Sequence, residues 1–289
     1  MFFFQNMPLC PYDWWFRAGF EYTACLTFAL IAIFIFGSCW GSFMNVCIWR
    51  MPRRESVVTA PSHCTSCGAD IRWYDNLPIV SYLVLRGRCR ACRTPYSCRY
   101  FIVELVMGLL FCAFFIKAGL SRQEPGVLAS GWVMLLFALA AAWIDAQHRI
   151  IPDALNYPAM LLGLLFAGLL PEVWGTPVWH KALLMSFLSG VIPGIFLAVF
   201  AVGGEKLTKK EVLGWGDVKF IMACGMLLGL PGAFFILCAG SLAGSIGGTL
   251  AAIAGRRTLK NASIAFGPYL AGAAILWLFA GNFLLNGLK

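Results

Sequence analysis

The chain alternates long apolar runs with short polar segments, and this pattern predicts membrane helices. A helix that crosses the hydrocarbon core of a bilayer needs about 20 mostly apolar residues. We expect spanning helices over residues 23–46, 101–119, 127–144, 154–170, 182–203, 218–230, 232–254 and 262–285. The predicted fold is an all-α polytopic membrane protein with about eight transmembrane helices.

Two of the predicted helices are separated by a single residue. Only Pro231 lies between the runs 218–230 and 232–254, and Gly232 follows it directly. A Pro-Gly pair favours a tight turn. We therefore expect the chain to reverse its direction at this point.

Residues 50–100 differ from the rest because they are polar, basic and rich in Cys, Pro and Gly. We predict three parts: residues 1–49 form an N-terminal segment with the first transmembrane helix, 50–100 a small cytoplasmic loop domain, and 101–289 a membrane bundle. The N-terminus has no basic start and no small-residue cleavage site before its first apolar run, so we expect that run to be retained as an anchor.

Composition and charge support a membrane protein. Hydrophobic residues make up 60% of the chain and charged residues 12%, which is about half the usual charged share. A net charge of +9 raises the question of a nucleic-acid partner. Most of the 22 Lys and Arg residues, however, fall on the side of the membrane that carries residues 50–100 if the helices alternate. This bias follows the positive-inside rule. It predicts an N-terminus outside, a polar loop in the cytoplasm, and membrane lipid rather than nucleic acid as partner.

Four of the twelve cysteines form two CxxC pairs, Cys64 with Cys67 and Cys89 with Cys92. Two such pairs can close a tetrahedral four-thiolate site, and zinc is its commonest occupant. The loop is too small for a core of its own, so metal binding would supply its folding energy. The alternatives are four free thiols or two disulfides, and a reducing cytoplasm disfavours disulfides. A closed site has no open position, so we predict structural Zn²⁺ without a catalytic role.

Two carboxylates stand at ends of apolar runs, Asp145 after one and Asp217 before another. The predicted topology puts both at cytoplasmic helix ends, where they can face each other. Such a pair holds one proton between its members. One carboxylate can then activate water while the other polarises a carbonyl, as in aspartic proteases. Alternatively, each caps a helix or pairs with a base such as Arg149 or Lys219, or the two serve a proton path.

Two further acids have structural interpretations. Asp153 follows Ile-Pro and is placed to cap the next helix. Glu104 lies just inside the second predicted span and is placed to pair with Arg99 or another loop arginine. We predict supporting roles for both.

Short motifs spread over most of the chain resemble, in order and spacing, those of the type IV prepilin peptidases, a family of GxGD membrane aspartyl peptidases. They are Gly41–Val46, Arg50–Pro52, Asp75–Pro78 with Ser81 and Tyr82, Arg86–Cys89, Arg99 and Tyr100 with Val103–Leu105, Asp145–Asp153, Gly214–Asp217 with Lys219, and Phe266–Tyr269. Phe101, where the family usually has Pro, departs from the pattern.

The resemblance implies that Asp145 and Asp217 are the catalytic pair. The substrate would be the precursor of a type IV pilin or of a type II secretion pseudopilin. It would be cut after a glycine that ends a basic leader, at the cytoplasmic face of the bacterial inner membrane. In the bifunctional branch, which the zinc loop marks, the new N-terminus is then methylated with S-adenosylmethionine. Glu55, Asp70 and Asp75 are candidates for holding the leader by charge sign alone.

Three alternatives remain open. The first is a peptidase without methyltransferase activity. The second is a non-enzymatic membrane scaffold of a secretion apparatus, with the zinc loop as its docking module. The third is a transporter or channel that uses the two aspartates as a proton path, which would require further ionisable residues deep in the helices.

Overall fold

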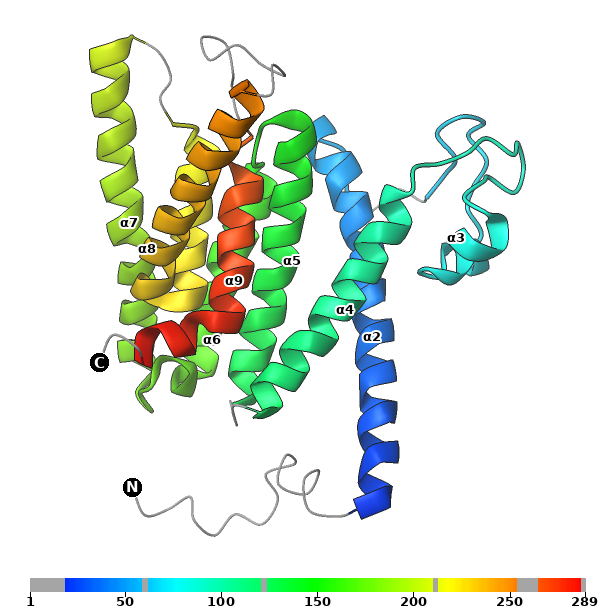
Figure 1. The fold of residues 1–289 in the computed structure, drawn as a ribbon, viewed down its shortest axis with the longest axis horizontal. Coiled ribbons are helices and arrows are strands. Elements are labelled where there is room, and N and C mark those ends of the chain that lie inside the picture. Colours follow the sequence, from blue (N-terminus) through cyan, green and yellow to red (C-terminus); the bar gives the residue numbers. More distant parts are fainter. Residues whose placement is uncertain (1–18, 59–61, 121–123, 210–212, 254–264, 287–289) are drawn as a thin grey trace. The chain divides into compact units, whose positions relative to one another are not determined.

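The structure is a computed structural model that describes residues 19–58, 62–120, 124–209, 213–253 and 265–286. Within these ranges the chain is helical, and the only extended pairings are two isolated β-bridges, His63 with Asp70 and Arg88 with Pro95. The predicted all-α class is confirmed. The long helices are α2 (Gly19–Arg50), α4 (Arg99–Leu120), α5 (Pro125–His148), α6 (Asp153–Leu169), α7 (Trp179–Thr208), α8 (Trp215–Ile253) and α9 (Gly267–Asn286) (Figure 1).

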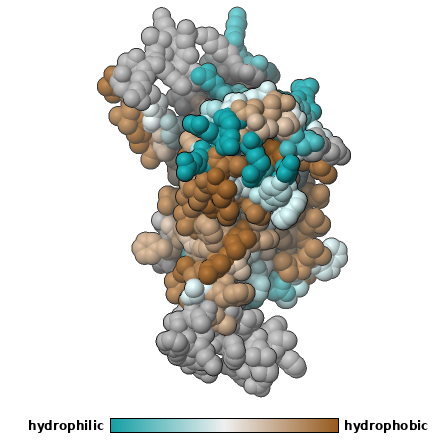
Figure 2. Space-filling model, turned by 90° about the vertical axis from the view of Figure 1, so that its right-hand side faces the viewer, coloured by the Kyte–Doolittle hydropathy of each residue, from teal (hydrophilic) through white to brown (hydrophobic). Residues whose placement is uncertain are grey.

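Five helices are long and apolar enough to cross a membrane, and two shorter apolar helices accompany them. The five lie at Cys25–Arg53, Arg99–Leu120, Pro125–His148, Trp179–Thr208 and Trp215–Leu250. Hydrophobic side chains cover much of the face in Figure 2, and hydrophilic ones gather toward one end of it. These features make the chain an integral membrane protein. The count of eight spans stays a prediction, and residues 254 and 262–264 of the predicted spans lie outside the described ranges.

Helix α8 is broken at Gly229, whose φ of 81° and ψ of 168° are not helical. Beyond the break, Gly232 packs against Trp277 of α9 and Gly244 against Phe266 at the start of α9. The second arm of α8 therefore runs antiparallel to α9 and ends beside its N-terminus. The first arm also begins there, as the carboxylate contacts below show. The predicted reversal is confirmed, and it pivots on Gly229 because glycine adopts a positive φ without steric cost.

The described residues form two compact units: residues 19–45 with 62–120, and residues 46–58 with the described part of 124–286. The second unit contains α5 to α9. Small residues let its helices approach closely, as is usual in membrane bundles. A Cβ atom at Gly225 of α8 would lie 2.0 Å from the backbone oxygen of Ser189 on α7. The buried hydroxyl of Ser186 donates to the Met226 carbonyl at 2.8 Å.

The first unit contains most of α2, the cysteine-rich loop, the short helices η2 (Trp73–Asn76) and α3 (Val80–Leu85), and α4. Glycines again set the helix spacing. A Cβ at Gly41 of α2 would lie 2.8 Å from the Cα of Glu104 on α4, and one at Gly37 would lie 2.9 Å from the Cβ of Phe111. The predicted domain boundaries at residues 49 and 100 stay predictions.

Candidate active site and metal centre

Asp145 lies in the last turn of α5 and is only 5% exposed. Its Oδ2 accepts a hydrogen bond of 2.7 Å from the backbone N–H of Gly267, the first residue of α9. The first N–H groups of a helix have no partner within the helix, so a carboxylate there satisfies one of them. This bond fixes the Asp145 side chain at the start of α9.

Asp217 is the third residue of α8 and is half-buried. Its own N–H donates to the carbonyl of Gly214 at 3.1 Å, which closes the first turn of the helix. Its carboxylate lies close enough to that of Asp145 for the two charges to interact. The structure thus brings together the two aspartates that the sequence singled out, which lie on different helices and are 72 residues apart in the sequence. Their catalytic role is taken up below as a proposal.

Gly267 leaves no space beside Asp145. A Cβ atom there would lie 2.8 Å from the Cβ of Asp145 and 3.0 Å from its Oδ2. Contacts this short force a neighbour to move, and Asp145 is buried. The glycine in the Phe266–Tyr269 motif is therefore the residue that lets the N-terminus of α9 reach the carboxylate.

Asn156 is a site residue that sequence reasoning missed. It lies in the first turns of α6, is fully buried, and its Nδ2 donates to the carbonyl of Gly216 at 3.4 Å. Its Oδ1 is buried without a hydrogen-bond partner among the described residues. A Cβ at Gly216 would also lie 3.0 Å from the carbonyl oxygen of Ile151, so the turn before Asp217 is packed tightly against the start of α6. The sequence did contain one indication of Asn156, because a polar amide inside an apolar run is costly to bury without a partner.

The capping role predicted for Asp153 is wrong. Asp153 is the first residue of α6, its N-cap is Pro152, and no side chain caps the helix. The carboxylate instead binds the ammonium of Lys219 on α8 at 2.7 and 2.8 Å. Asp153 can reach Lys219 because the start of α6 packs against the start of α8, as the contact between Gly216 and Ile151 shows. The pair is partly exposed, with the Asp153 side chain 53% accessible, so its contribution to stability is small.

We expect Asn156→Leu to lower the rate constant for catalysis at this site by about three- to tenfold, the value of one ordinary hydrogen bond. The leucine keeps roughly the volume of the side chain but removes the side-chain donor to the Gly216 carbonyl. Because Asn156 positions the turn and does not reach the carboxylates, kcat should fall with little change in KM, and Asn156→Ser should retain part of the rate. Steady-state kinetics check this, and an unchanged kcat in Asn156→Leu would remove the residue from the site.

The four predicted cysteine ligands lie together. Their sulfur atoms all lie within 4.8 Å of one another, and none of the four forms a disulfide. The four are Cys64, Cys67, Cys89 and Cys92. Four thiolates in a tetrahedron around zinc are about 3.8 Å apart, and the sulfurs of Cys64 and Cys92 are 3.9 Å apart. The donor set and its geometry therefore fit a metal ion.

The two CxxC turns have the same backbone geometry. In the first, the N–H of Cys64 donates to Ala69 and that of Gly68 returns to Cys64, both at 2.9 Å. In the second, Cys89 donates to Thr94 at 2.9 Å and Arg93 returns to Cys89 at 3.0 Å. Hydrogen bonding to Thr94 lowers the pKa of the Cys92 thiol to about 6, which favours the thiolate, the form that binds metals.

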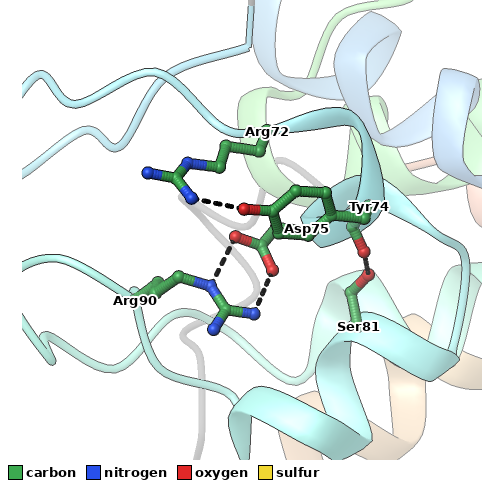
Figure 3. Close-up of polar contacts among 5 residues, drawn as sticks. All are labelled: Arg72, Tyr74, Asp75, Ser81 and Arg90. Carbon is green, nitrogen blue, oxygen red and sulfur yellow. Dashed lines mark hydrogen bonds and ion pairs between the residues drawn. The ribbon is translucent and has the colours of Figure 1, made fainter.

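An ion pair ties the second CxxC turn to the loop between the turns (Figure 3). Arg90, between the two cysteines of that turn, binds Asp75 through two bonds of 2.8 and 2.6 Å. Hydrogen bonding from Arg90 holds the pKa of Asp75 below its ordinary value. The neighbouring Tyr74 accepts from Arg72, and its carbonyl accepts from Ser81. The charge of Asp75 is thus compensated within the loop, which weakens its candidacy for holding a basic leader.

Glu104 holds the loop to α4. It is 7% exposed and accepts a bond of 2.7 Å from the N–H of Ile79 as well as one from Ser42. Ile79 has a φ of 62°, an uncommon and strained conformation for a β-branched residue. The charged hydrogen bond offsets part of that strain. The predicted arginine partner is therefore replaced by a backbone N–H and a hydroxyl.

Comparisons with known proteins match the regions that contain the four cysteines and the two aspartates. The family described as "Bacterial Peptidase A24 N-terminal domain" matches residues 35–118, which include the four cysteines. The "Type IV leader peptidase family" matches residues 132–249, which include Asp145 and Asp217. No solved structure matches the chain.

Curated relatives match over most of the chain. A protein of Xanthomonas campestris is 32% identical over 86% of this chain and 90% of its own length, and one of Stutzerimonas stutzeri is 32% identical over 87% and 91%. One of Myxococcus xanthus is 33% identical over 78% of this chain, and the match spans 64% of that relative. All three are named "Prepilin leader peptidase/N-methyltransferase". With these relatives and the matched domains, the chain belongs to the type IV leader peptidase family.

Proposed function

We propose that this protein is a membrane aspartyl peptidase that removes the leader from type IV prepilin or pseudopilin precursors and then methylates the new N-terminus. The observation that carries the peptidase half is the meeting of Asp145 and Asp217 from two helices at one site. Family membership supplies the substrate class, since its relatives carry the name of a prepilin leader peptidase/N-methyltransferase.

In the proposed mechanism the two carboxylates share one proton. The ionised carboxylate takes a proton from a water molecule, and the water oxygen attacks the carbonyl carbon of the scissile peptide. The protonated carboxyl donates a hydrogen bond to the carbonyl oxygen as negative charge develops on it, and the carbonyl carbon becomes tetrahedral. Collapse of this intermediate breaks the C–N bond and returns a proton to the leaving amine. The N–H of Gly267 holds Asp145 in place throughout, because it binds Oδ2 and leaves Oδ1 for the reaction.

The substrate side of the proposal follows from membrane placement. The precursor would present its apolar helix from within the bilayer, with the basic leader in the cytoplasm. The location would be the bacterial inner membrane, with the N-terminus outside and the cysteine-rich loop inside, as the distribution of Lys and Arg predicts. Methylation would transfer a methyl group from the sulfonium of S-adenosylmethionine, a second substrate, to the amine that cleavage exposes.

The metal at the four cysteines would be zinc, in a structural role. We expect one zinc per chain, lost in Cys89→Ser, with faster hydrogen exchange over residues 62–98 because the loop would lose the metal that folds it. Cys98→Ser is the matched control, since Cys98 is an exposed cysteine of the same loop outside the cluster. Elemental analysis and exchange mass spectrometry check this. Zinc retained in Cys89→Ser, or lost equally in Cys98→Ser, would contradict the assignment.

The function is tested by incubating the purified protein in detergent with a prepilin, with and without S-adenosylmethionine, and measuring intact product masses. We expect one cut after the glycine that ends the leader, and a methyl-sized mass increase only with the donor. Cleavage without methylation would leave a peptidase alone. A folded, zinc-loaded protein that cuts none of several prepilins would favour the scaffold or the transporter.

A further inference from the structure

Helix α3 (Val80–Leu85) exposes an apolar face. Val80, Leu83 and Val84 are 53%, 60% and 69% exposed, while Ser81 on the opposite side is buried and donates to the carbonyl of Tyr74 at 3.2 Å. The neighbouring η2 adds Trp73, which is 80% exposed. So many large apolar side chains on a short loop are unusual in water and mark a surface that meets an apolar environment.

The depth of α3 along α4 points to that environment. Helix α4 has 22 residues, or about 33 Å at 1.5 Å per residue, so a hydrocarbon core of about 30 Å covers nearly all of it. Glu104 comes five residues after the first residue, Arg99, and thus lies about 6 Å below the edge of the core. Its side chain leans back toward the helix N-terminus and binds the N–H of Ile79, immediately before α3. Helix α3 therefore begins near the level where hydrocarbon meets headgroups.

The surroundings of α3 have the composition of a membrane interface. The ring of Tyr82 lies 5.4 Å from those of both Tyr96 and Phe101, and tyrosines are enriched at headgroup level. Arg86 and Arg88 are exposed directly after the helix. Arginines beside an apolar patch complement anionic lipid headgroups.

We propose that α3 is an interfacial anchor whose Val80, Leu83 and Val84 insert at the headgroup–acyl boundary of the bilayer that α4 crosses. Arg86 and Arg88 bind the phosphate groups of anionic lipids at its end. The anchor gives the cysteine-rich loop a third attachment to the membrane, besides the ends of α2 and α4. This inference needs the chain to be a membrane protein and does not depend on its peptidase activity.

The test uses Leu83→Trp in the full chain, reconstituted into vesicles of phosphatidylcholine and phosphatidylglycerol. The 11 native tryptophans set the background, and the added emission is obtained by difference from wild type. We expect lipids brominated near the headgroup to quench the added emission at least about twofold and aqueous iodide to leave it unchanged. Val84→Trp repeats the measurement in case the first variant does not fold. Glu55→Trp, at an exposed charged position beyond the end of α2, should show the opposite pattern.

Two results would overturn the anchor. Quenching of the residue-83 emission by iodide and not by brominated lipid would place the face in water. Insensitivity to both quenchers would mean that protein, from this chain or a bound partner, covers the face. Zinc content and thermal unfolding, measured on each variant, show whether the loop is folded when the emission is read.

Discussion

We expect Asp217→Asn to lower kcat/KM for leader cleavage by about 10³-fold, and Asp145→Asn to do the same. An amide has nearly the shape of a carboxylate, so the helix ends stay in place. It can, however, neither take a proton from water nor donate a carboxyl proton to the carbonyl oxygen. The expected loss lies within the range of 10²–10⁴ that positioned acids and bases contribute. Initial rates from product masses, measured at equal zinc content, give the comparison.

Asp153→Asn is the matched control for these two variants. Asp153 is an aspartate at the start of α6 whose partner is Lys219 rather than Asp145 or Asp217. Losing a partly exposed ion pair should change the rate by less than about threefold. If Asp153→Asn were as inactive as Asp217→Asn, the site would depend on net charge and not on the two carboxylates. If either Asp145→Asn or Asp217→Asn kept more than about a tenth of the rate, that residue would not act in proton transfer.

Gly267→Ala has the second-largest expected effect, a fall in kcat of about 10²-fold. The new methyl group would lie 2.8 Å from the Cβ of Asp145, so either α9 or the carboxylate must shift. A displacement of about 1 Å in a reacting group costs this much because the geometry of attack is lost. Substrate binding along the bilayer should be little affected, so KM should stay nearly constant.

Gly272→Ala lies on the same helix and serves as its control. A Cβ at Gly272 meets nothing within 4 Å, and alanine in a helix interior is favoured over glycine by about 0.5–1 kcal/mol. This variant should keep full activity and unfold at the same or a higher temperature. Equal activity of Gly267→Ala and Gly272→Ala would show that Asp145 tolerates displacement. An equal loss in both would indicate a general disturbance of α9.

The apolar pattern predicted the helices well because membrane helices must satisfy their backbone within the lipid. Their ends extend past the apolar runs, as α7 does at Trp179–Thr208 against the predicted 182–203, since a helix continues into the headgroup region. The Pro-Gly pattern predicts the pivot of α8 at Pro231 and Gly232, whereas the structure has it at Gly229. The break occurs at Gly229 because this residue adopts a positive φ, which the Pro-Gly pair two residues later does not predict.

The site was predicted in part. Asp145, Asp217 and the four cysteines stood out because carboxylates at membrane helix ends and paired CxxC turns are rare without a role. The four sulfurs lie together and the two carboxylates are close enough to interact, whereas the chemistry of both groups stays a proposal. Asn156 and the bond from Gly267 were missed because they depend on which helix ends meet in space. The pairing of Asp75 with Arg90 was also hidden, since 14 residues of loop separate them in the sequence.

The most direct test of the central claim is the double variant Asp145→Asn/Asp217→Asn, measured beside the two single variants. If the carboxylates act as one unit, removing the first already abolishes the shared chemistry. The double variant should then retain the residual rate of the singles to within a few fold. Losses that multiply, to about 10⁶-fold in the double variant, or a double variant that cleaves prepilin as wild type does, would contradict an aspartate pair as the active site.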